Sequence, residues 1–302
     1  MADLAPVPAA DPFPRQRVRL GREDDHELEL AYYEVGFGHP IVFLHGNPTS
    51  SHLWRNVVPH VQQLGRCIAV DLIGMGESSR LPHPGPGSYS FGRHAQLLSH
   101  FLEQLEVTER VVLVGSEWGS ALAFDWARRN PGAVRGIAFM EPVVQPVIWA
   151  DVPEDTKRLY QQLRGPGGEQ LSQQEDPVVE ELLPASVLRG LAAETLDRYR
   201  QPYRDPADRW PTLEWTRQLP IDHAPPAVHD VLDAAGQWMA HSEVPKLFVD
   251  TSPAVPRSYR MRRVVRRWPA LTEVTLPAGR LVAEDAPDEL GRALADWIPT
   301  LA

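Results

Sequence analysis

The sequence predicts an α/β fold with a mostly parallel central sheet flanked by helices, and three observations lead to this prediction. Short apolar runs such as residues 41–44 and 67–70 alternate with segments of helical periodicity. Runs that are apolar at every position are typical of parallel strands buried on both faces. Each run ends in a polar or glycine-containing loop, and ligands bind at the carboxyl ends of the strands in such sheets.

The elements are expected in the following order. Polar and apolar residues alternate at 17–19 and 27–33, as in antiparallel strands that open a sheet. Apolar strands are then predicted at 41–44, 67–70, 110–115, 134–140 and 246–249. A helix-like segment containing Trp54 and Val57 follows the first apolar strand, and residues 120–129 form a helix after the third.

Composition excludes several kinds of partner. The chain has 302 residues, enough for one large core and an insertion, and a formal net charge of -10 that disfavours nucleic acid. We find no apolar stretch long enough to span a membrane and no leader-like N-terminal segment. The single cysteine, Cys67, lies in an apolar run, excludes an internal disulfide and suits a cytoplasmic protein. We expect no metal, no cofactor, and a monomer or homodimer.

The most informative local feature is Gly115-Ser116-Glu117-Trp118-Gly119, between an apolar strand and a helix. Small residues two before and two after a central position are typical of a nucleophile elbow, a tight turn that exposes the central side chain. By position that side chain is Glu117, and Ser116 is a weaker alternative because it points elsewhere in such a turn. Alone, these five residues are equally compatible with an ordinary strand-to-helix turn.

Several further motifs occur along the chain. They are His45-Gly46-Asn47-Pro48-Thr49-Ser50-Ser51, Asp71-Leu72-Ile73-Gly74-Met75-Gly76-Glu77-Ser78, Phe139-Met140-Glu141, Leu182-Leu183-Pro184, Tyr199-Arg200-Gln201-Pro202-Tyr203 and Glu284-Asp285-Ala286-Pro287-Asp288-Glu289-Leu290-Gly291. Together with the elbow, and in this order, they resemble the haloalkane dehalogenases and their relatives the coelenterate luciferases, over a region from about residue 15 to the C-terminus. The resemblance implies an α/β-hydrolase fold with residues 1–141 and 222–302 as the core and residues 142–221 as an inserted helical cap.

The resemblance also implies roles for individual residues. In that family a carboxylate at the elbow displaces halide to form an ester, which a His-activated water then hydrolyses. Glu117 occupies the elbow, while Asn47 and Trp118 match the donors that hold the departing anion. Glu141 matches the acid that orients the histidine, with Asp250, after a later strand, as the runner-up. Alternatively, Asn47 only braces its loop, Trp118 is a core residue and Glu141 is exposed or caps a helix.

The sequence departs from the family at both essential positions. Glu117 stands where Asp is expected, Arg280 stands where the catalytic His is expected, and no histidine follows His241. Arginine stays protonated at physiological pH, so it cannot take a proton from water. The resemblance implies that residue 280 lies between Glu117 and Glu141, so we expect these two acids and Arg280 to form a charged cluster. Alternatively, the cluster is a satisfied polar network that only fills a disused pocket.

Three hypotheses follow, in order. The first is a non-hydrolytic enzyme that catalyses a cyclisation, rearrangement or elimination on a hydrophobic small molecule. The second is a dehalogenase-like hydrolase with an unusual water-activating group, and the third is a ligand-binding protein with an inactive site. The cap should close an apolar pocket over the elbow, and its aromatic residues are expected mainly in the cap core. These aromatic residues are Tyr160, Tyr199, Tyr203, Trp210 and Trp215.

Overall fold

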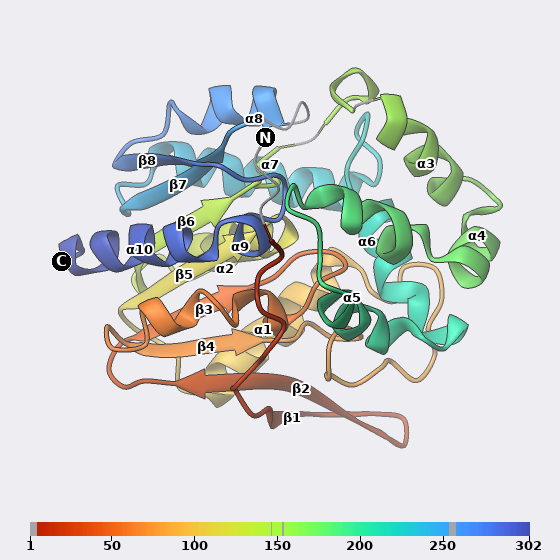
Figure 1. Ribbon diagram of the computed structural model, residues 1–302, viewed down its shortest axis with the longest axis horizontal. Helices are drawn as coiled ribbons and strands as arrows, with labels where there is room; N and C mark the ends of the chain where they lie inside the picture. Colours follow the sequence, from red (N-terminus) through yellow and green to blue (C-terminus); the bar gives the residue numbers. More distant parts are fainter. Residues whose placement is uncertain (1–4, 146, 153, 254–257) are drawn as a thin grey trace.

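A computed structural model describes residues 5–145, 147–152, 154–253 and 258–302. Eight strands form one sheet in the order β1-β2-β4-β3-β5-β6-β7-β8, which runs from bottom to top in Figure 1. β1 pairs with β2 and β2 with β4 in antiparallel register, and all other neighbours are parallel. The predicted α/β-hydrolase fold is confirmed.

All the predicted strands are present, with ends that differ by a few residues. One further strand, β8, was not predicted, because it lies at the sheet edge and most of its side chains are exposed or half-buried. An edge strand of this kind lacks the continuous apolar run that identifies the central strands. The strands are β1 (Gln16–Glu23), β2 (His26–Val35), β3 (Pro40–Leu44), β4 (Arg66–Val70), β5 (Val111–Ser116), β6 (Val134–Met140), β7 (Lys246–Thr251) and β8 (Leu271–Leu276).

Alternate side chains of the strands enter two separate cores, one on each face of the sheet. In β3, Val42 and Leu44 belong to one core, whereas Ile41 and Phe43 belong to the other. The first core is covered by α1 (Phe91–Gln104), α2 (Trp118–Arg129), α7 (Pro226–His241) and α8 (Ser258–Val265). The second is covered by the loop after β3, α9 (Val282–Asp285) and α10 (Pro287–Trp297). Cys67 is fully buried in the second core, as predicted.

The segment that contains Trp54 and Val57 corrects one prediction. It forms two short 3-10 helices, η1 (Ser51–Trp54) and η2 (Val58–His60), and no α-helix. Pro59 lies inside the second turn, where it fixes φ and supplies no N–H for an α-helical hydrogen bond. The apolar pattern was correct, because Trp54 and Val57 are buried, but it did not distinguish 3-10 turns from an α-helix.

The residues between β6 and α7 form a set of helices beside the sheet, shown in green and cyan in Figure 1. We call residues 142–221 the helical insertion, and its limits as a separate cap stay a prediction. The helices of the insertion are η3 (Trp149–Asp151), α3 (Glu154–Arg164), α4 (Gly168–Glu175), η4 (Val178–Leu182), η5 (Pro184–Ser186), α5 (Ala193–Arg200), η6 (Gln201–Tyr203), η7 (Pro206–Arg209) and α6 (Trp210–Gln218).

No helix in the described ranges of the chain is both long and apolar enough to cross a membrane.

Candidate active site

Glu117 occupies the turn between β5 and α2. Its backbone has φ 51° and ψ −116°, a strained combination for a residue with a side chain. The turn is fixed on both sides, since the Glu117 N–H donates to the Met140 carbonyl (3.1 Å) and its carbonyl accepts from Ser120 N–H (3.0 Å). Ser116, the weaker alternative, is the last residue of β5 and pairs with Met140 in the sheet. Glu117 therefore holds the elbow position.

The glycines around Glu117 are required by close packing. A Cβ on Gly119 would lie 2.1 Å from the Leu44 carbonyl oxygen, and a Cβ on Gly115 would lie 2.6 Å from the Ser120 Cα. A Cβ on Gly46 would lie 2.7 Å from Glu117 Oε2, so the carboxylate lies against the loop after β3. The close approach of this loop to the elbow is possible only without side chains at these positions.

Arg280 forms an ion pair with Glu117. Arg280 Nη2 contacts Glu117 Oε1, and the two side chains are 19% and 1% exposed, respectively. Burial by itself lowers the pKa of Arg280, but the Glu117 carboxylate, with Tyr160 and Glu141 nearby, raises that pKa above its ordinary value. Arg280 is thus a permanent cation beside the elbow, in the position expected from the sequence.

Glu141 directly follows β6, and it contacts side chains on β7 and α8. Thr251 Oγ1 donates to Glu141 Oε1 at 3.2 Å, and Arg262 Nη2 lies 3.8 Å from the same oxygen. The charge of Glu141 still contributes to the raised pKa of Arg280. In place of one compact cluster, Glu117 and Arg280 form a close ion pair, while Glu141 contacts a different arginine, Arg262.

Asp250, the runner-up for the acid, belongs to the same network. Arg262 Nε lies 2.6 Å from Asp250 Oδ1, and Arg266 Nη2 lies 3.0 Å from Asp250 Oδ2. Arg262 is 6% exposed and thus joins both candidate acids. The sequence analysis did not single out Arg262. The available clue in the sequence was an arginine-rich segment soon after Asp250. Which acids Arg262 contacts depends on how α8 packs against the strands, which the sequence does not show.

Asn47 and Trp118 line the same small cavity as Glu117 and Arg280. Asn47 Nδ2 donates to the Thr212 carbonyl of the helical insertion at 3.0 Å, so one of its two N–H groups is already used. The Trp118 ring packs beside the Trp215 ring, with centroids 4.7 Å apart. Asn47 therefore braces the insertion and also faces the elbow cavity.

The cavity at the elbow is small. It has a volume of about 20 Å³, and a neighbouring cavity of about 10 Å³ shares four of its lining residues. Each volume is close to the space of one water molecule. Two of the predicted insertion-core aromatics line the elbow cavity instead of lying only in the insertion core. Its lining residues are Asn47, Glu117, Trp118, Val143, Tyr160, Trp215, Thr216, Leu219 and Arg280.

Two buried histidines lie close to the site, and neither was predicted as a site residue from the sequence. Leu72 N–H donates to His45 Nε2 (3.0 Å) and His45 Nδ1 lies 2.9 Å from the Gly46 carbonyl, so both ring nitrogens are engaged. His94 stacks on Trp215 at 4.3 Å, and burial lowers its pKa to about 3. Burial also lowers the pKa of His45, against the opposing effect of Asp71. Both imidazoles therefore stay neutral at physiological pH.

Comparison with known proteins gives a consistent result. The family described as alpha/beta hydrolase fold matches residues 39–287. A haloalkane dehalogenase from Sphingobium indicum is 44% identical over 273 residues, which cover 90% of this chain and 92% of the relative. One from Mycolicibacterium smegmatis is 39% identical over 97% of this chain and 93% of its own length. The crystal structure of a haloalkane dehalogenase from Bradyrhizobium elkani superposes with a TM-score of 0.88 at 36% identity, covering 95% of this chain and 98% of that one.

Proposed function

The chain belongs to the haloalkane dehalogenase family of the α/β-hydrolase fold, and from this premise we propose that it catalyses a non-hydrolytic reaction on a hydrophobic small molecule. The reaction class is a cyclisation, rearrangement or elimination. The observation that carries the proposal is the ion pair of Arg280 with Glu117, because a guanidinium in that place cannot activate water.

Glu117 serves as a base or as a stabiliser of developing positive charge. Its ion pair with Arg280 weakens the carboxylate as a nucleophile, because the guanidinium attracts its negative charge. In an elimination, Glu117 accepts a proton from carbon while the leaving group departs with the electron pair of its bond. Asn47 and Trp118 hold the departing anion or a carbonyl oxygen, with the second Asn47 N–H and the indole N–H as donors.

The lining of the elbow cavity supports an apolar substrate, and its small volume means that the site has to open before a substrate can bind. Val143, Trp215 and Leu219 supply apolar surface. About 20 Å³ is far below the ~300–1,000 Å³ of ordinary small-molecule sites, so the helical insertion must move to admit a substrate. The predicted cap then acts as a lid that excludes water, and exclusion of water favours a non-hydrolytic outcome.

Two other functions are each favoured by one observation. A hydrolase that uses Glu117 as the nucleophile is favoured by relatives named haloalkane dehalogenase at 38% to 44% identity. A ligand-binding protein without catalysis is favoured by the small volume of the elbow cavity and by the pairing of Glu117 with an arginine.

A labelling experiment in H₂¹⁸O separates the three. The purified protein is incubated with bromoalkanes and with a panel of hydrophobic compounds that carry a leaving group or an epoxide. Bromide, the intact protein mass and the product mass are measured, with Glu117→Gln as the matched control. We expect a Glu117-dependent isomer or elimination product without ¹⁸O. Steady bromide release with ¹⁸O in the alcohol product establishes the hydrolase instead. Saturable binding of panel compounds with no product and no adduct establishes the binding protein.

A further inference from the structure

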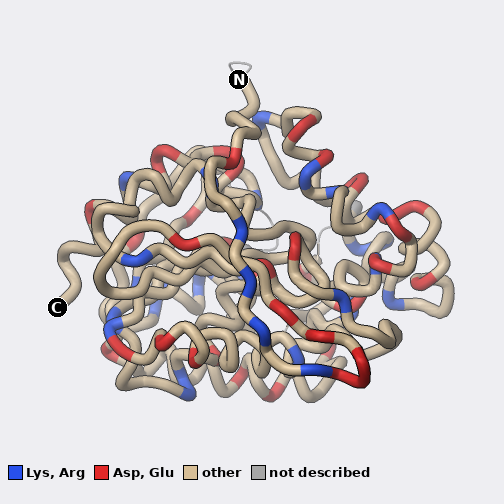
Figure 2. The backbone as a smooth tube through the Cα atoms, turned by 90° about the horizontal axis from the view of Figure 1, so that it is seen from below, with Lys and Arg blue, Asp and Glu red and all other residues tan. Residues whose placement is uncertain are grey.

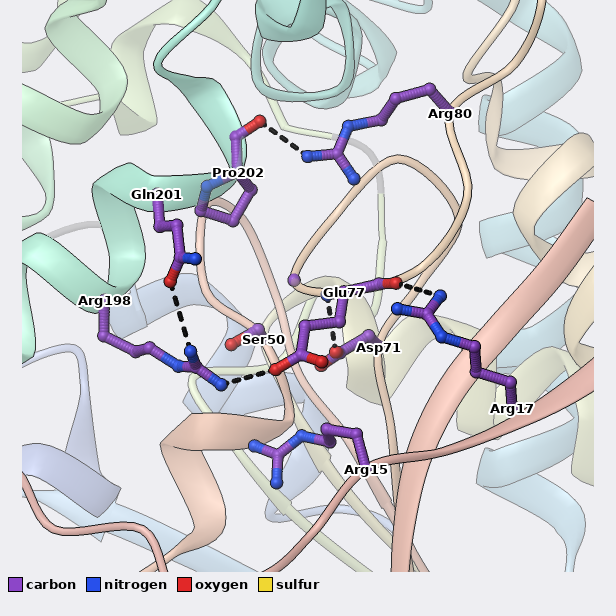
Figure 3. A pocket seen from close by; sticks show the side chains of 10 residues that line it. Arg15, Arg17, Ser50, Asp71, Glu77, Arg80, Arg198, Gln201 and Pro202 are labelled. Carbon is purple, nitrogen blue, oxygen red and sulfur yellow. Dashed lines mark hydrogen bonds and ion pairs between the residues drawn. The ribbon is translucent and has the colours of Figure 1, made fainter.

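A second and larger cavity lies at the junction of the helical insertion and the sheet core. It has a volume of about 250 Å³, and we call it the seam pocket (Figure 3). It is separate from the elbow cavity, since the two share no lining residue. The residues of the seam pocket are Arg15, Arg17, Ser50, Asp71, Gly76, Glu77, Arg80, Arg198, Gln201 and Pro202.

The wall of the seam pocket is basic in an acidic protein. Four arginines face two carboxylates there, whereas the whole chain has a net charge of -10. Basic residues recur along β1, which crosses the face shown in Figure 2. A concave site with a local excess of positive charge concentrates anions.

The two carboxylates of the wall are already bound. Asp71 is buried, and its two oxygens accept from the backbone N–H groups of Ser51 (2.7 Å) and Glu77 (2.8 Å). The Glu77 side chain pairs with Arg198 Nη2 at 2.6 Å. Asp71 and Glu77 therefore neutralise only some of the four arginines that line the pocket.

Arg17 keeps guanidinium donors available at the pocket. Arg17 donates to the Glu77 carbonyl (2.7 Å) and, among the described residues, has no carboxylate within ion-pair distance. By contrast, Arg15 pairs with Asp11, and Arg80 Nε lies 3.6 Å from Asp208 Oδ1. A guanidinium carries five N–H groups, so Arg17 retains donors for an oxyanion.

Two neutral side chains add donors to the same wall. Ser50 Oγ accepts from His52 N–H (3.3 Å), which leaves its hydroxyl hydrogen to donate. Gln201 Oε1 accepts from Arg198 Nη1 (3.1 Å), which leaves its amide NH₂ as a donor. Guanidinium forks with hydroxyl and amide donors are the groups that bind phosphate and carboxylate oxygens in proteins.

We propose that the seam pocket is a binding site for a small oxyanion, a phosphate monoester or a carboxylate. About 250 Å³ is slightly below the ~300–1,000 Å³ of sites for drug-sized ligands, which limits the occupant to a small anion. The oxyanion lies against Arg17, Arg198 and the Ser50 hydroxyl. This inference does not depend on the reaction catalysed at the elbow.

A bound oxyanion joins two parts of the molecule. Arg198 and Gln201 belong to α5 and η6 of the helical insertion, whereas Arg17 lies on β1 and Ser50 in the loop after β3. Asn47 of the elbow cavity lies in the same loop as Ser50. An oxyanion therefore holds the insertion against the core and opposes the movement that opens the elbow cavity.

The test uses the full chain with inorganic phosphate, citrate and acetate, each at an ionic strength matched with chloride. Calorimetric titration and thermal unfolding are measured for the wild type and for Arg17→Gln, Arg198→Gln and Glu77→Gln. Arg292→Gln is the matched control, because Arg292 is 60% exposed on α10 and pairs with Glu289.

We expect saturable binding of phosphate or citrate and a rise in Tm of about 2–4 °C at saturation. Arg17→Gln and Arg198→Gln weaken binding by about tenfold, Glu77→Gln strengthens it because an opposing charge is removed, and Arg292→Gln changes nothing. The stronger of phosphate and citrate identifies the ligand class. The proposal is overturned if binding is not saturable, or if phosphate raises the Tm of all variants equally, since that is a general salt effect on a pocket that holds water.

Discussion

Two buried arginine–glutamate pairs in this molecule have the same chemistry and very different surroundings. Arg55 and Glu284 are fully buried, with Arg55 Nη1 2.6 Å from Glu284 Oε1 and Nη2 3.0 Å from Oε2. Tyr199 also donates to Glu284 Oε1 at 2.6 Å. Arg280 and Glu117, by contrast, border a cavity, and the Arg280 side chain remains 19% exposed.

The difference lies in how completely each pair is satisfied. Arg55 Nε donates to the Pro8 carbonyl at 3.0 Å, whereas Arg280 Nε has no hydrogen-bond partner within the described ranges. Glu117 also has a strained backbone, with φ 51°. A structural ion pair has its N–H groups and oxygens hydrogen-bonded, which offsets the cost of desolvation, whereas a pair at a functional site keeps backbone strain and borders a space for a ligand. Arg55–Glu284 has the character of the first kind and Arg280–Glu117 that of the second.

The largest expected effect comes from the structural pair. Glu284→Gln leaves Arg55 as a buried charge without a carboxylate, which costs about 3–5 kcal/mol of unfolding free energy. Urea unfolding of the variant and the wild type measures the loss. A loss below about 1 kcal/mol would show that the Arg55–Glu284 pair contributes little to stability, and the contrast with the Arg280–Glu117 pair would not hold.

The next effect concerns chemistry at the elbow. The double variant Glu117→Asp, Arg280→His supplies the nucleophile and base that the family resemblance implies, so we expect bromide release from a bromoalkane at least ~10-fold above the wild type, or about 1.4 kcal/mol in barrier. The control, Glu117→Asn with Arg280→His, should stay inactive. If a folded double variant neither releases bromide nor forms an adduct, then features beyond these two residues prevent hydrolysis.

A smaller effect is expected when the site pair is broken. Glu117→Gln should change the unfolding free energy by less than about 1 kcal/mol, because the cavity and the partial exposure of Arg280 allow its charge to be hydrated. The same urea series that tests Glu284→Gln gives this value. Equal losses in the two variants would indicate that the elbow pair is a structural filler and would favour the ligand-binding function.

The last effect concerns the pH dependence of stability, at a carboxylate that is paired less well than either. Asp176 is buried 3.8 Å from Arg209, and burial raises its pKa from 3.8 to about 7. The folded protein therefore binds an extra proton between about pH 4 and pH 7, so its unfolding free energy falls as pH rises through that window. Asp176→Asn should remove this slope, and Asn suits the left-handed φ of 46° there. A pH series of urea unfolding would reject the assignment if the slope persisted in the variant.

The sequence by itself determined the central strands and the elbow. Continuous apolar runs identified β3 to β7, because strands buried on both faces tolerate little else. Gly115 and Gly119 identified the elbow, because the backbone packs too closely there for a Cβ. The resemblance to the dehalogenases implied that Arg280 lies near Glu117, and the two side chains form an ion pair in the structure.

Only the tertiary structure decided which charges pair and which spaces stay open. Arg262 joins Glu141 and Asp250 because α8 packs against the ends of β6 and β7, and no sequence spacing encodes that contact. The small elbow cavity and the larger seam pocket are each lined by side chains from both the core and the helical insertion. Such contacts join residues far apart in the chain, so their geometry follows from packing of whole elements and not from local pattern.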